Sequence, residues 1–521
     1  MNRIWKIPAR RLPSGCLAAA AALLLSACAG LPDLADRTVS GYIDTDSAPR
    51  LEAALPSERP SEKQVGQSGV YLLADPRDAF VARAMLIEHA DRSLDIAYYI
   101  WHDDVSGKML FQMLQRAAQR GVRVRLLLDD NNTRGMDDVL AALDAEDNIE
   151  IRLFNPFPHR KVRALGYLTD FPRLNRRMHN KSLTADNQYT IVGGRNIGDE
   201  YFNVTTDIGF ADLDVLAKGE VAEDVSRDFD RYWASGSSYP FFSIAPRADA
   251  EKGRLKLHRS RRDDAEIRAS YLDELAASPL AAAISEGNVP WQYADARLIS
   301  DDPAKGLARD KELPAIADSL LEALGKPEKD VFIVSPYFVP SKWGMAALRD
   351  LTANNVKVTV LTNSLRATDV AAVHSGYARY RKDLLNAGVE LYEVKPDFAP
   401  PKIRDKGLTG SSATSLHAKT FVVDGKRVFI GSLNFDPRSA RLNTEMGMVI
   451  DHAGIAGDMR QELEKITPQY AYKVVMDKQR KRLRWQDPDQ PDMLLKNEPD
   501  AGIWKRIISN IFSILPIEKL L

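Results

Sequence analysis

The chain has 521 residues, with 71 basic and 72 acidic side chains and only two cysteines. Its hydrophobic content of 45% and charged content of 27% are ordinary for a globular protein, which excludes a disordered tail, a collagen-like fibre and a polytopic membrane protein. Two cysteines also exclude a disulfide-rich scaffold and a cysteine-based zinc cluster.

The first 27 residues are typical of a secretory leader. Arg3, Lys6, Arg10 and Arg11 precede any acidic residue, and the apolar run Cys16–Leu25 is too short to span a bilayer. The sequence Leu-Ser-Ala-Cys28 that ends this region resembles a bacterial lipobox, so residues 1–27 are expected to be a lipoprotein signal peptide and Cys28 to be lipidated. Plain secretion, with cleavage near Ala29, is the alternative.

Loss of the leader would change the formal net charge from −1 to −5. An acidic chain is a poor candidate for non-specific nucleic-acid binding. A lipidated Cys28 would hold the protein on a membrane of the bacterial cell envelope. Ala29 after it weakly favours the outer over the inner membrane by the enterobacterial sorting rule. Residues 28–67 lack clear periodicity and are expected to form a tether.

The next elements occur twice in the same order. In each half a buried strand, an amphipathic helix and two further strands follow one another, which predicts βαβ units with right-handed connections. The strands are expected at 93–101, 121–128 and 148–154, and again at 330–338, 355–362 and 388–394. The fold class is therefore α/β, with two duplicated domains and mixed, largely parallel sheets.

The domains are expected at 68–245 and 316–475. The region 246–315 between them is polar and predicts a linker with surface elements. Residues 476–521 form a basic and amphipathic C-terminal segment, in which Trp504, Ile507, Ile511 and Leu515 share one helical face. This helix belongs either to the core or to a membrane interface.

Each half contains one histidine-centred motif with the same spacing. Lysine follows histidine by two residues, aspartate follows lysine by five, and glycine follows aspartate by seven, with a small residue and an asparagine beyond it. The motifs are His179-Asn-Lys181, Asp186 and Gly193-Gly194-Arg-Asn196, then His417-Ala-Lys419, Asp424 and Gly431-Ser432-Leu-Asn434. Two such matches at corresponding places in a duplicated chain are far beyond chance.

The spacing has a physical interpretation. On a strand, residues i and i+2 point to the same face, so each histidine shares a face with its lysine. Such a pair suits a phosphoryl group, because the lysine neutralises non-bridging oxygens while the imidazole attacks phosphorus or protonates a leaving oxygen. Two facing pairs would surround one phosphate without a metal.

The motif pair resembles the HKD signature of the phospholipase D superfamily. From about residue 68 to the C-terminus the chain is similar to the bacterial cardiolipin synthase branch of that superfamily. The similar segments include Tyr98-Tyr99-Ile100-Trp101, Arg152–Phe157, Leu174–His179, Gly193–Phe202 and Ile514–Glu518. The resemblance implies two phospholipase D-type domains packed as a pseudo-twofold pair around one cleft.

The family's chemistry is a two-step phosphatidyl transfer through a phosphohistidine. By analogy His179 is the nucleophile and His417 the general acid and base, although the nearly equivalent motifs do not separate these roles. The candidate catalytic set comprises His179, Lys181, Asp186, His417, Lys419 and Asp424, in which the aspartates are expected to stabilise the local hairpin. Phosphate binding is expected of Asn196, Asn434, Gly194 and Ser432. In the family, an acidic residue beyond each motif orients an imidazole. Glu445 fits this pattern in the second half. Asp212 fits it in the first half, where Asp214 is a neighbouring candidate for the same role.

The implied activity is cardiolipin synthesis without a metal or other cofactor. The acceptor would be phosphatidylglycerol, and the donor would be phosphatidylglycerol or phosphatidylethanolamine. The protein would contact the membrane through its lipid anchor and would not bind nucleic acid. A requirement for an accessory protein stays open. The alternatives are a phospholipase D hydrolase that releases phosphatidic acid and a phosphodiesterase or nuclease of the same superfamily. Two interpretations also fit the basic residues before His179, namely a solvated face or an anionic headgroup site. These residues are Arg160, Lys161, Arg163, Arg173, Arg176 and Arg177.

Overall fold

The computed structural model of the chain describes residues 30–511 except 36, 46, 57–63, 65, 205–207, 260–261, 309–315, 369, 397–412, 478, 503–504 and 508–510. The leader and Cys28 lie outside the described residues, as do Trp504 and Leu515, so these predictions stay predictions.

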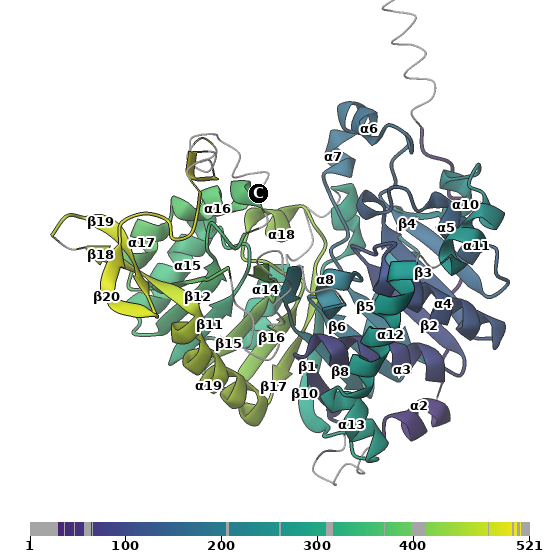
Figure 1. Cartoon of the computed structure of the whole chain (residues 1–521), viewed down its shortest axis with the longest axis horizontal. Coiled ribbons are helices and arrows are strands. Elements are labelled where there is room, and N and C mark those ends of the chain that lie inside the picture. The colour runs from purple at the N-terminus through teal and green to yellow at the C-terminus, as the bar shows by residue number, and fades with distance from the viewer. Residues whose placement is uncertain are drawn as a thin grey trace, which may run out of the picture.

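The first half is a sheet in the order β9-β4-β3-β2-β5-β6-β8-β1, with helices on both faces (Figure 1). Its strands are β1 (Ser68–Leu73), β2 (Ser93–Tyr98), β3 (Arg123–Asp129), β4 (Ile149–Phe154), β5 (Ser182–Ala185), β6 (Tyr189–Gly193), β8 (Asp214–Lys218) and β9 (Ser238–Pro240). Its helices are α3 (Pro76–His89), α4 (Val105–Gln119), α5 (Asp137–Asp144), α6 (Arg163–Thr169), α7 (Phe171–Leu174), α8 (Asp199–Phe202), α9 (Glu220–Trp233), α10 (Phe241–Ile244), α11 (Ala250–His258), α12 (Arg262–Ala276) and α13 (Pro279–Ser285).

The second half repeats this arrangement in the order β10-β17-β16-β15-β11-β12-β13-β18-β19-β20. Its strands are β10 (Gln292–Ser300), β11 (Asp330–Val334), β12 (Lys357–Asn363), β13 (Glu390–Val394), β15 (Thr420–Val423), β16 (Arg427–Gly431), β17 (Met446–Asp451), β18 (Ala471–Asp477), β19 (Arg482–Asp487) and β20 (Gln490–Leu495). Its helices are α14 (Ile316–Leu324), α15 (Ser341–Ala353), α16 (Ala371–Ala378), α17 (Arg381–Asn386), α18 (Pro437–Arg441) and α19 (Ala453–Tyr470).

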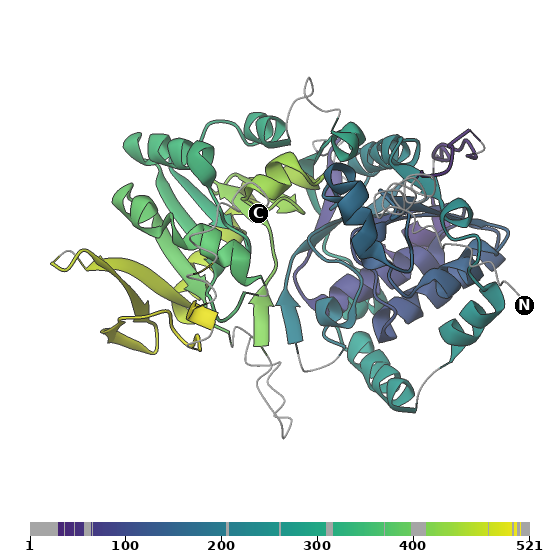
Figure 2. The ribbon, with the colours of Figure 1, turned by 90° about the horizontal axis from the view of Figure 1, so that it is seen from above.

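The two halves are joined along strands. β1 pairs antiparallel with β10, so the two sheets form one continuous surface. A second, two-stranded sheet also links them, because β7 (Ile208–Ala211) pairs parallel with β14 (Ala413–Leu416). Figure 2 shows these two arrows, blue and green, side by side between the halves. Each half also has its own apolar core.

The duplicated, mixed α/β fold is confirmed, but parallel pairing is more limited than predicted. Within the two large sheets only β2-β3-β4 and β11-β12-β13 are parallel. The other strands pair antiparallel. Some pairs are short hairpins, such as β5–β6 and β15–β16, and others join strands distant in the chain, such as β2–β5 and β11–β15. The parallel strand β2 is buried along its whole length, as a strand covered by helices on both faces should be.

The helices begin where the sequence supplies caps. The Asp104 side chain accepts a hydrogen bond from the backbone amide of Gly107 (2.9 Å) at the start of α4. Leu110, Phe111 and Leu114 then lie buried on one face of this helix, against the sheet. This is the βαβ helix that the sequence predicted after the first strand.

The tether expected over residues 28–67 does not match the structure at residues 37–45 and 47–55, where the chain packs on the first half. The Arg37 guanidinium donates to the carbonyl oxygens of Ser235 (2.6 Å) and Ala234 (2.7 Å). Helix α2 (Pro49–Ala54) follows, and Leu51 and Leu55 are fully buried in the core. Ala48, Leu51 and Leu55 recur at helical spacing, but three apolar residues are too short a pattern to predict a buried helix from the sequence.

Two other regions are more ordered than the sequence suggested. The expected linker contains β10, which lies between β1 and β17 at the joint of the halves. The basic C-terminal segment contains β19 and β20, which extend the sheet beyond β18. No helix in the described part of the chain is long and apolar enough to cross a membrane.

Candidate active site

The two motifs lie at the start of two equivalent hairpins. Lys181 directly precedes β5 and Lys419 directly precedes β15, and each of these strands turns back through an antiparallel partner. The two histidines come together at the joint of the halves, where the charges of His417 and Lys419 act on the imidazole of His179. Both imidazoles are largely buried, with exposed fractions of 7% and 8%.

Each histidine is held by a carboxylate of the opposite half. His179 Nδ1 lies 2.8 Å from Glu445 Oε2, and His417 Nδ1 lies 2.5 Å from Asp212 Oδ2. The backbone makes the same exchange. The His179 amide donates to the Thr444 carbonyl (2.9 Å), and the His417 amide donates to the Ala211 carbonyl (2.8 Å). Neither half therefore holds a complete site by itself.

The sequence left Asp212 and Asp214 as neighbouring candidates, and the structure separates them. Asp214 accepts hydrogen bonds from the buried Arg83 guanidinium (2.9 Å) and from the Arg195 amide (3.0 Å). It is therefore part of the ionic core of the first half, whereas Asp212 contacts an imidazole. Asp212 lies between β7 and β8, which begins at Asp214, so the two carboxylates do not share a face as residues i and i+2 of one strand would.

Gly194 and Ser432, predicted to bind phosphate, instead contact the two carboxylates. A Cβ atom at Gly194 would lie 2.0 Å from Asp212 Oδ1, so only glycine leaves room for this carboxylate. At the equivalent place the Ser432 hydroxyl donates to Glu445 Oε2 (2.5 Å) and accepts from the Met446 amide (3.0 Å). Both residues position an imidazole through its carboxylate partner.

The two asparagines are buried beside the site. The Asn196 carboxamide accepts from the Ile100 amide (3.1 Å) and donates to the Tyr201 hydroxyl (2.9 Å), which ties β2 to the loop after β6. The carboxamide oxygen of Asn434 has no hydrogen-bond partner among the described residues. Phosphate binding by Asn196 and Asn434 stays a prediction.

Aromatic rings surround both imidazoles, and the sequence interpretation missed this role. The Tyr99 ring meets His179 edge to face at 4.9 Å, and Tyr201 and Phe210 lie 5.4 and 5.1 Å from His417. Tyr99 directly follows the carboxyl end of β2, a place where site residues gather in α/β sheets. That position was the available signal. The rings cover part of the surface of both imidazoles.

Both lysines are almost fully buried behind the histidines. Lys181 Nζ donates to the His179 carbonyl (2.6 Å), and Lys419 Nζ donates to the His417 carbonyl. Burial lowers the pKa of Lys181 to about 7. An anion placed beside this ammonium would raise its pKa again, so the site favours a phosphate-like ligand.

The carboxylates differ in charge although their geometry is equivalent. Burial raises the pKa of Glu445 to about 7. Burial acts on Asp212 in the same direction, but His417, Lys419 and Arg195 outweigh it and lower the pKa of that carboxyl well below its usual range. Burial also lowers the pKa of His179 strongly and that of His417, where the Asp212 anion opposes the shift.

The two motif aspartates do not belong to the reacting centre. Asp186 and Asp424 lie in the hairpin turns, at the far end of β5 and β15 from the histidines, with positive φ angles of 52° and 55°. The Asp186 carboxylate accepts from the amides of Asp91, Arg92 and Ser93 at 2.7–2.8 Å. Asp424 accepts in the same way from the amides at the start of β11. Their inclusion in the catalytic set is therefore corrected to a structural role.

Replacement of Asp186 by asparagine should lower stability and spare catalysis. An amide accepts these backbone hydrogen bonds less strongly than a carboxylate, so we expect a loss of about 1–3 kcal/mol in the free energy of unfolding. Urea denaturation measures that loss, and kcat of the folded enzyme at 25 °C should stay within about twofold. A hundredfold lower kcat at unchanged stability would return Asp186 to the catalytic set.

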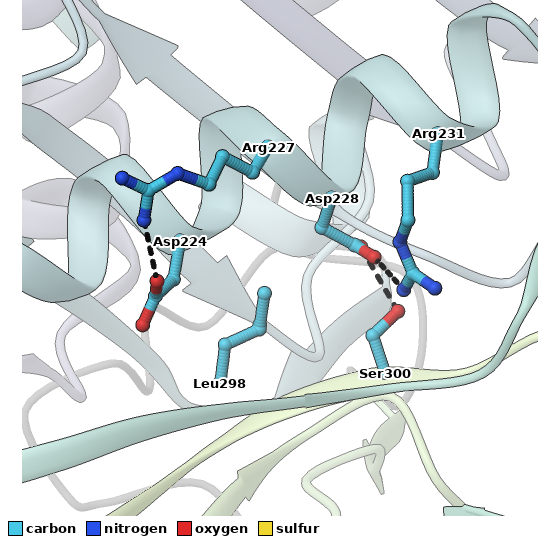
Figure 3. Close-up of a pocket in the computed structure, with 6 residues that line it drawn as sticks. All are labelled: Asp224, Arg227, Asp228, Arg231, Leu298 and Ser300. Carbon is cyan, nitrogen blue, oxygen red and sulfur yellow. Dashed lines mark hydrogen bonds and ion pairs between the residues drawn. The ribbon is translucent and has the colours of Figure 1, made fainter.

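The described residues include two further polar clusters outside the motifs. A pocket of about 250 Å³ lies between α9 and β10. Its arginines pair with aspartates on the same helix (Figure 3). The side chains of His102, Asp104 and Glu200 lie close enough to hold a metal ion. Asp104, however, already caps α4 and accepts from the Asp199 amide (2.8 Å).

Comparison with known proteins agrees with the duplicated site. The family described as "Cardiolipin synthase, PLD-like domain" matches residues 84–233 and 320–467, one match for each motif. Cardiolipin synthase C of Escherichia coli (strain K12) is 48% identical over 483 residues, which cover 91% of this chain and 100% of that protein. The major cardiolipin synthase of Bacillus subtilis (strain 168) is 26% identical and covers 75% of this chain and 67% of its own length.

The fold recurs in a solved structure of much lower identity. Phosphatidylserine synthase of Haemophilus influenzae Rd KW20 superposes with a TM-score of 0.56 at 13% identity, over 91% of this chain and 99% of that one. The matched ranges contain both motifs, and the two halves share one pairing of histidines and carboxylates. The chain therefore belongs to the phospholipase D superfamily, in the family of cardiolipin synthases with two PLD-like domains.

Proposed function

We propose that this chain is a phosphatidyltransferase that makes cardiolipin through a phosphohistidine intermediate. The observation that carries the proposal is the crossed pair of hydrogen bonds from His179 to Glu445 and from His417 to Asp212. A carboxylate that accepts the Nδ1 proton leaves the Nε2 lone pair of the imidazole free for attack or proton transfer. Two such imidazoles beside two buried lysines fit a phosphodiester.

The first step transfers the phosphatidyl group to the enzyme. His179 Nε2 forms a bond to phosphorus, the bond from phosphorus to the headgroup oxygen breaks, and His417 gives its Nε2 proton to the departing alcohol. The alcohol is glycerol from phosphatidylglycerol or ethanolamine from phosphatidylethanolamine. Lys181 and Lys419 stabilise the charge on the non-bridging oxygens as the transition state forms.

The second step uses the same groups in reverse. His417 removes the proton from a hydroxyl of the acceptor phosphatidylglycerol, whose oxygen attacks phosphorus and releases His179. The electrostatics agree with this division of roles. A strongly lowered pKa keeps His179 neutral, as a nucleophile requires, whereas the Asp212 anion opposes the lowering that burial imposes on the pKa of His417.

The lipid product distinguishes this proposal from hydrolysis. Purified protein incubated with labelled phosphatidylglycerol, with and without phosphatidylethanolamine, should yield labelled cardiolipin on thin-layer chromatography. Phosphatidic acid as sole product would mean that water reaches the phosphohistidine and would overturn the transferase proposal. A chelator should leave the rate unchanged, since the groups beside the phosphate are imidazoles and ammonium groups.

The location and partners of the enzyme are also proposals. The basic start, apolar run and Cys28 support a lipoprotein held on a membrane of the cell envelope, the outer one favoured weakly. We include three further points in this proposal. The acceptor is phosphatidylglycerol, phosphatidylethanolamine can serve as donor, and an accessory protein can bind the enzyme.

A further inference from the structure

A group of large apolar side chains is exposed on the short helices α6 and α7. We call this group the α6–α7 cap. Its members are Val162, Leu165, Tyr167, Leu168 and Phe171, with exposed fractions of 53%, 39%, 36%, 83% and 45%. The two helices project from the upper edge of the first half in Figure 1. Scattered exposed apolar residues are ordinary, but a contiguous group on a projecting element marks an interaction site.

The cap is held rigidly from its inner side. Leu174 is fully buried, and a Cβ atom at Gly166 would lie 2.9 Å from it, so α6 and α7 pack closely. The Tyr167 ring packs edge to face on the buried Phe157 ring at 5.4 Å, and its hydroxyl donates to Asn131 (3.2 Å). The outward side chains are therefore presented by a fixed support.

The segment that carries the cap is basic in sequence, but most of its basic side chains are paired and only Lys161 is exposed. Residues 158–178 contain six basic residues and one acidic one. Arg160 pairs with Asp130 and Asp137, and Arg163 also contacts Asp130. Lys161 is exposed next to Val162 at the edge of the cap. Exposed apolar side chains with a lysine at their edge suit the interface of a membrane that contains anionic lipids.

The cap also lies close to the catalytic histidine. Helix α7 ends at Leu174, five residues before His179. In the same stretch Arg177 donates to the Asp129 carboxylate (3.1 Å), and the Met178 amide also donates to it (2.8 Å). A short segment that is held on Asp129 therefore connects the cap to the catalytic histidine.

The start of the described chain runs to the same region. Arg37 donates to the carbonyl of Ser238 in β9, which pairs with β4, the strand that leads into α6. Burial raises the pKa of Tyr239, and the charges of Arg173, Asp170 and Arg37 act on the same phenol. Arg37 therefore lies near the corner between α6 and α7. A lipid at Cys28, nine residues earlier, would reach the same membrane.

We propose that the α6–α7 cap docks the enzyme on an anionic phospholipid bilayer, with the cap side chains in the interface and Lys161 beside the headgroups. This inference rests on the proposed function only in that the substrate is a bilayer lipid. A protein partner for the cap is an alternative occupant, which the experiment below distinguishes.

The test compares two double variants in the chain from Ala29 onward, which contains every residue that the structure describes and carries no lipid. The first is Leu168→Ser with Phe171→Ser. The matched control is Leu255→Ser with Phe242→Ser, because these residues are 72% and 58% exposed on α11 and α10, elsewhere on the same half (Figure 1). Flotation measures binding to vesicles of phosphatidylglycerol and phosphatidylcholine in equal parts.

The cap variant should bind these vesicles about tenfold more weakly or worse, and the control variant should bind like the original chain. Turnover of dihexanoyl phosphatidylglycerol below its micelle concentration should be unchanged in both. Any of three results would overturn the docking inference. The cap variant could bind vesicles as tightly as the original chain, both variants could lose vesicle binding equally, or the cap variant could lose as much turnover of the monomeric lipid as it loses vesicle binding. If the cap variant bound vesicles normally but lost a protein from pull-down, the occupant would be that protein. If no variant transfers phosphatidyl groups while the binding difference holds, the docking inference stands and the proposed function fails.

Discussion

Replacement of His179 or His417 by alanine should lower cardiolipin formation by about a thousandfold or more. Both steps need both imidazoles, since one forms the bond to phosphorus and the other moves the proton. The two side chains are largely buried and each binds a carboxylate of the other half. No neighbouring group in the described site offers a second nucleophile at the same place.

The two alanine variants should differ in one property. A phosphatidyl ester with a nitrophenol leaving group needs no proton from an acid, so His179 should still attack it in the His417→Ala variant. The covalent adduct should then accumulate on His179, because the acceptor lacks its base. Intact-mass spectrometry should find the phosphatidyl adduct in His417→Ala and none in His179→Ala. An adduct in His179→Ala alone would reverse the assignment of the two histidines.

Replacement of another histidine provides the control for this result. His258 lies on α11, where Nε2 contacts Gln115 (3.1 Å) away from the motifs. His258→Ala should form cardiolipin at the original rate and accumulate no adduct. Substantial loss in this variant would show that the assay responds to stability, and the alanine results would then need correction for the folded fraction.

The chemistry was visible in the sequence because it depends on local spacing. Histidine and lysine two residues apart must share the face of an extended segment, whatever the tertiary structure. The repeated strand and helix order likewise predicted the duplicated fold. The aspartates Asp186 and Asp424 share this local character, and their positive φ angles match hairpin turns.

The crossed pairing could not be read from spacing. Glu445 is 266 residues from His179, and Asp212 is 205 residues from His417. Their contact depends on β7 pairing with β14 and on the bridge between Met178 and Thr444. Both join segments across the two halves. Packing of residues 37–45 and 47–55 was also missed, because it depends on a few long-range contacts of Arg37, Leu51 and Leu55.

The second large effect follows from this crossing. In the His417→Ala background, Glu445→Gln should slow adduct formation on His179 about a hundredfold, because an amide does not stabilise the positive charge that develops on the imidazole. Asp212→Asn should change that rate little, since its imidazole is already absent. If each carboxylate instead served the histidine of its own half, the two results would be exchanged.

The pH dependence gives an independent check on Glu445. Its pKa of about 7 means that the carboxylate forms as the pH rises through neutrality, so adduct formation at saturating lipid should increase over the same range. A bound phosphodiester keeps Lys181 charged there. The increase should be absent in Glu445→Gln. Asp212 has a pKa below its usual range and should contribute no change near neutral pH.

Stability should respond to the same carboxyl group with a sign that can be worked out. The pKa of Glu445 is higher in the folded protein than its ordinary 4.5, so its contribution to stability is complete below pH 4.5 and is lost as the pH rises to about 7. That loss amounts to about 3 kcal/mol, and Glu445→Gln cannot undergo it. Urea denaturation measures the free energy of unfolding of the original protein and of Glu445→Gln. Between pH 5 and 8 the glutamine variant should therefore become more stable relative to the original protein. A difference independent of pH would mean that Glu445 stays ionised throughout, and the rise of activity near pH 7 would then belong to another group.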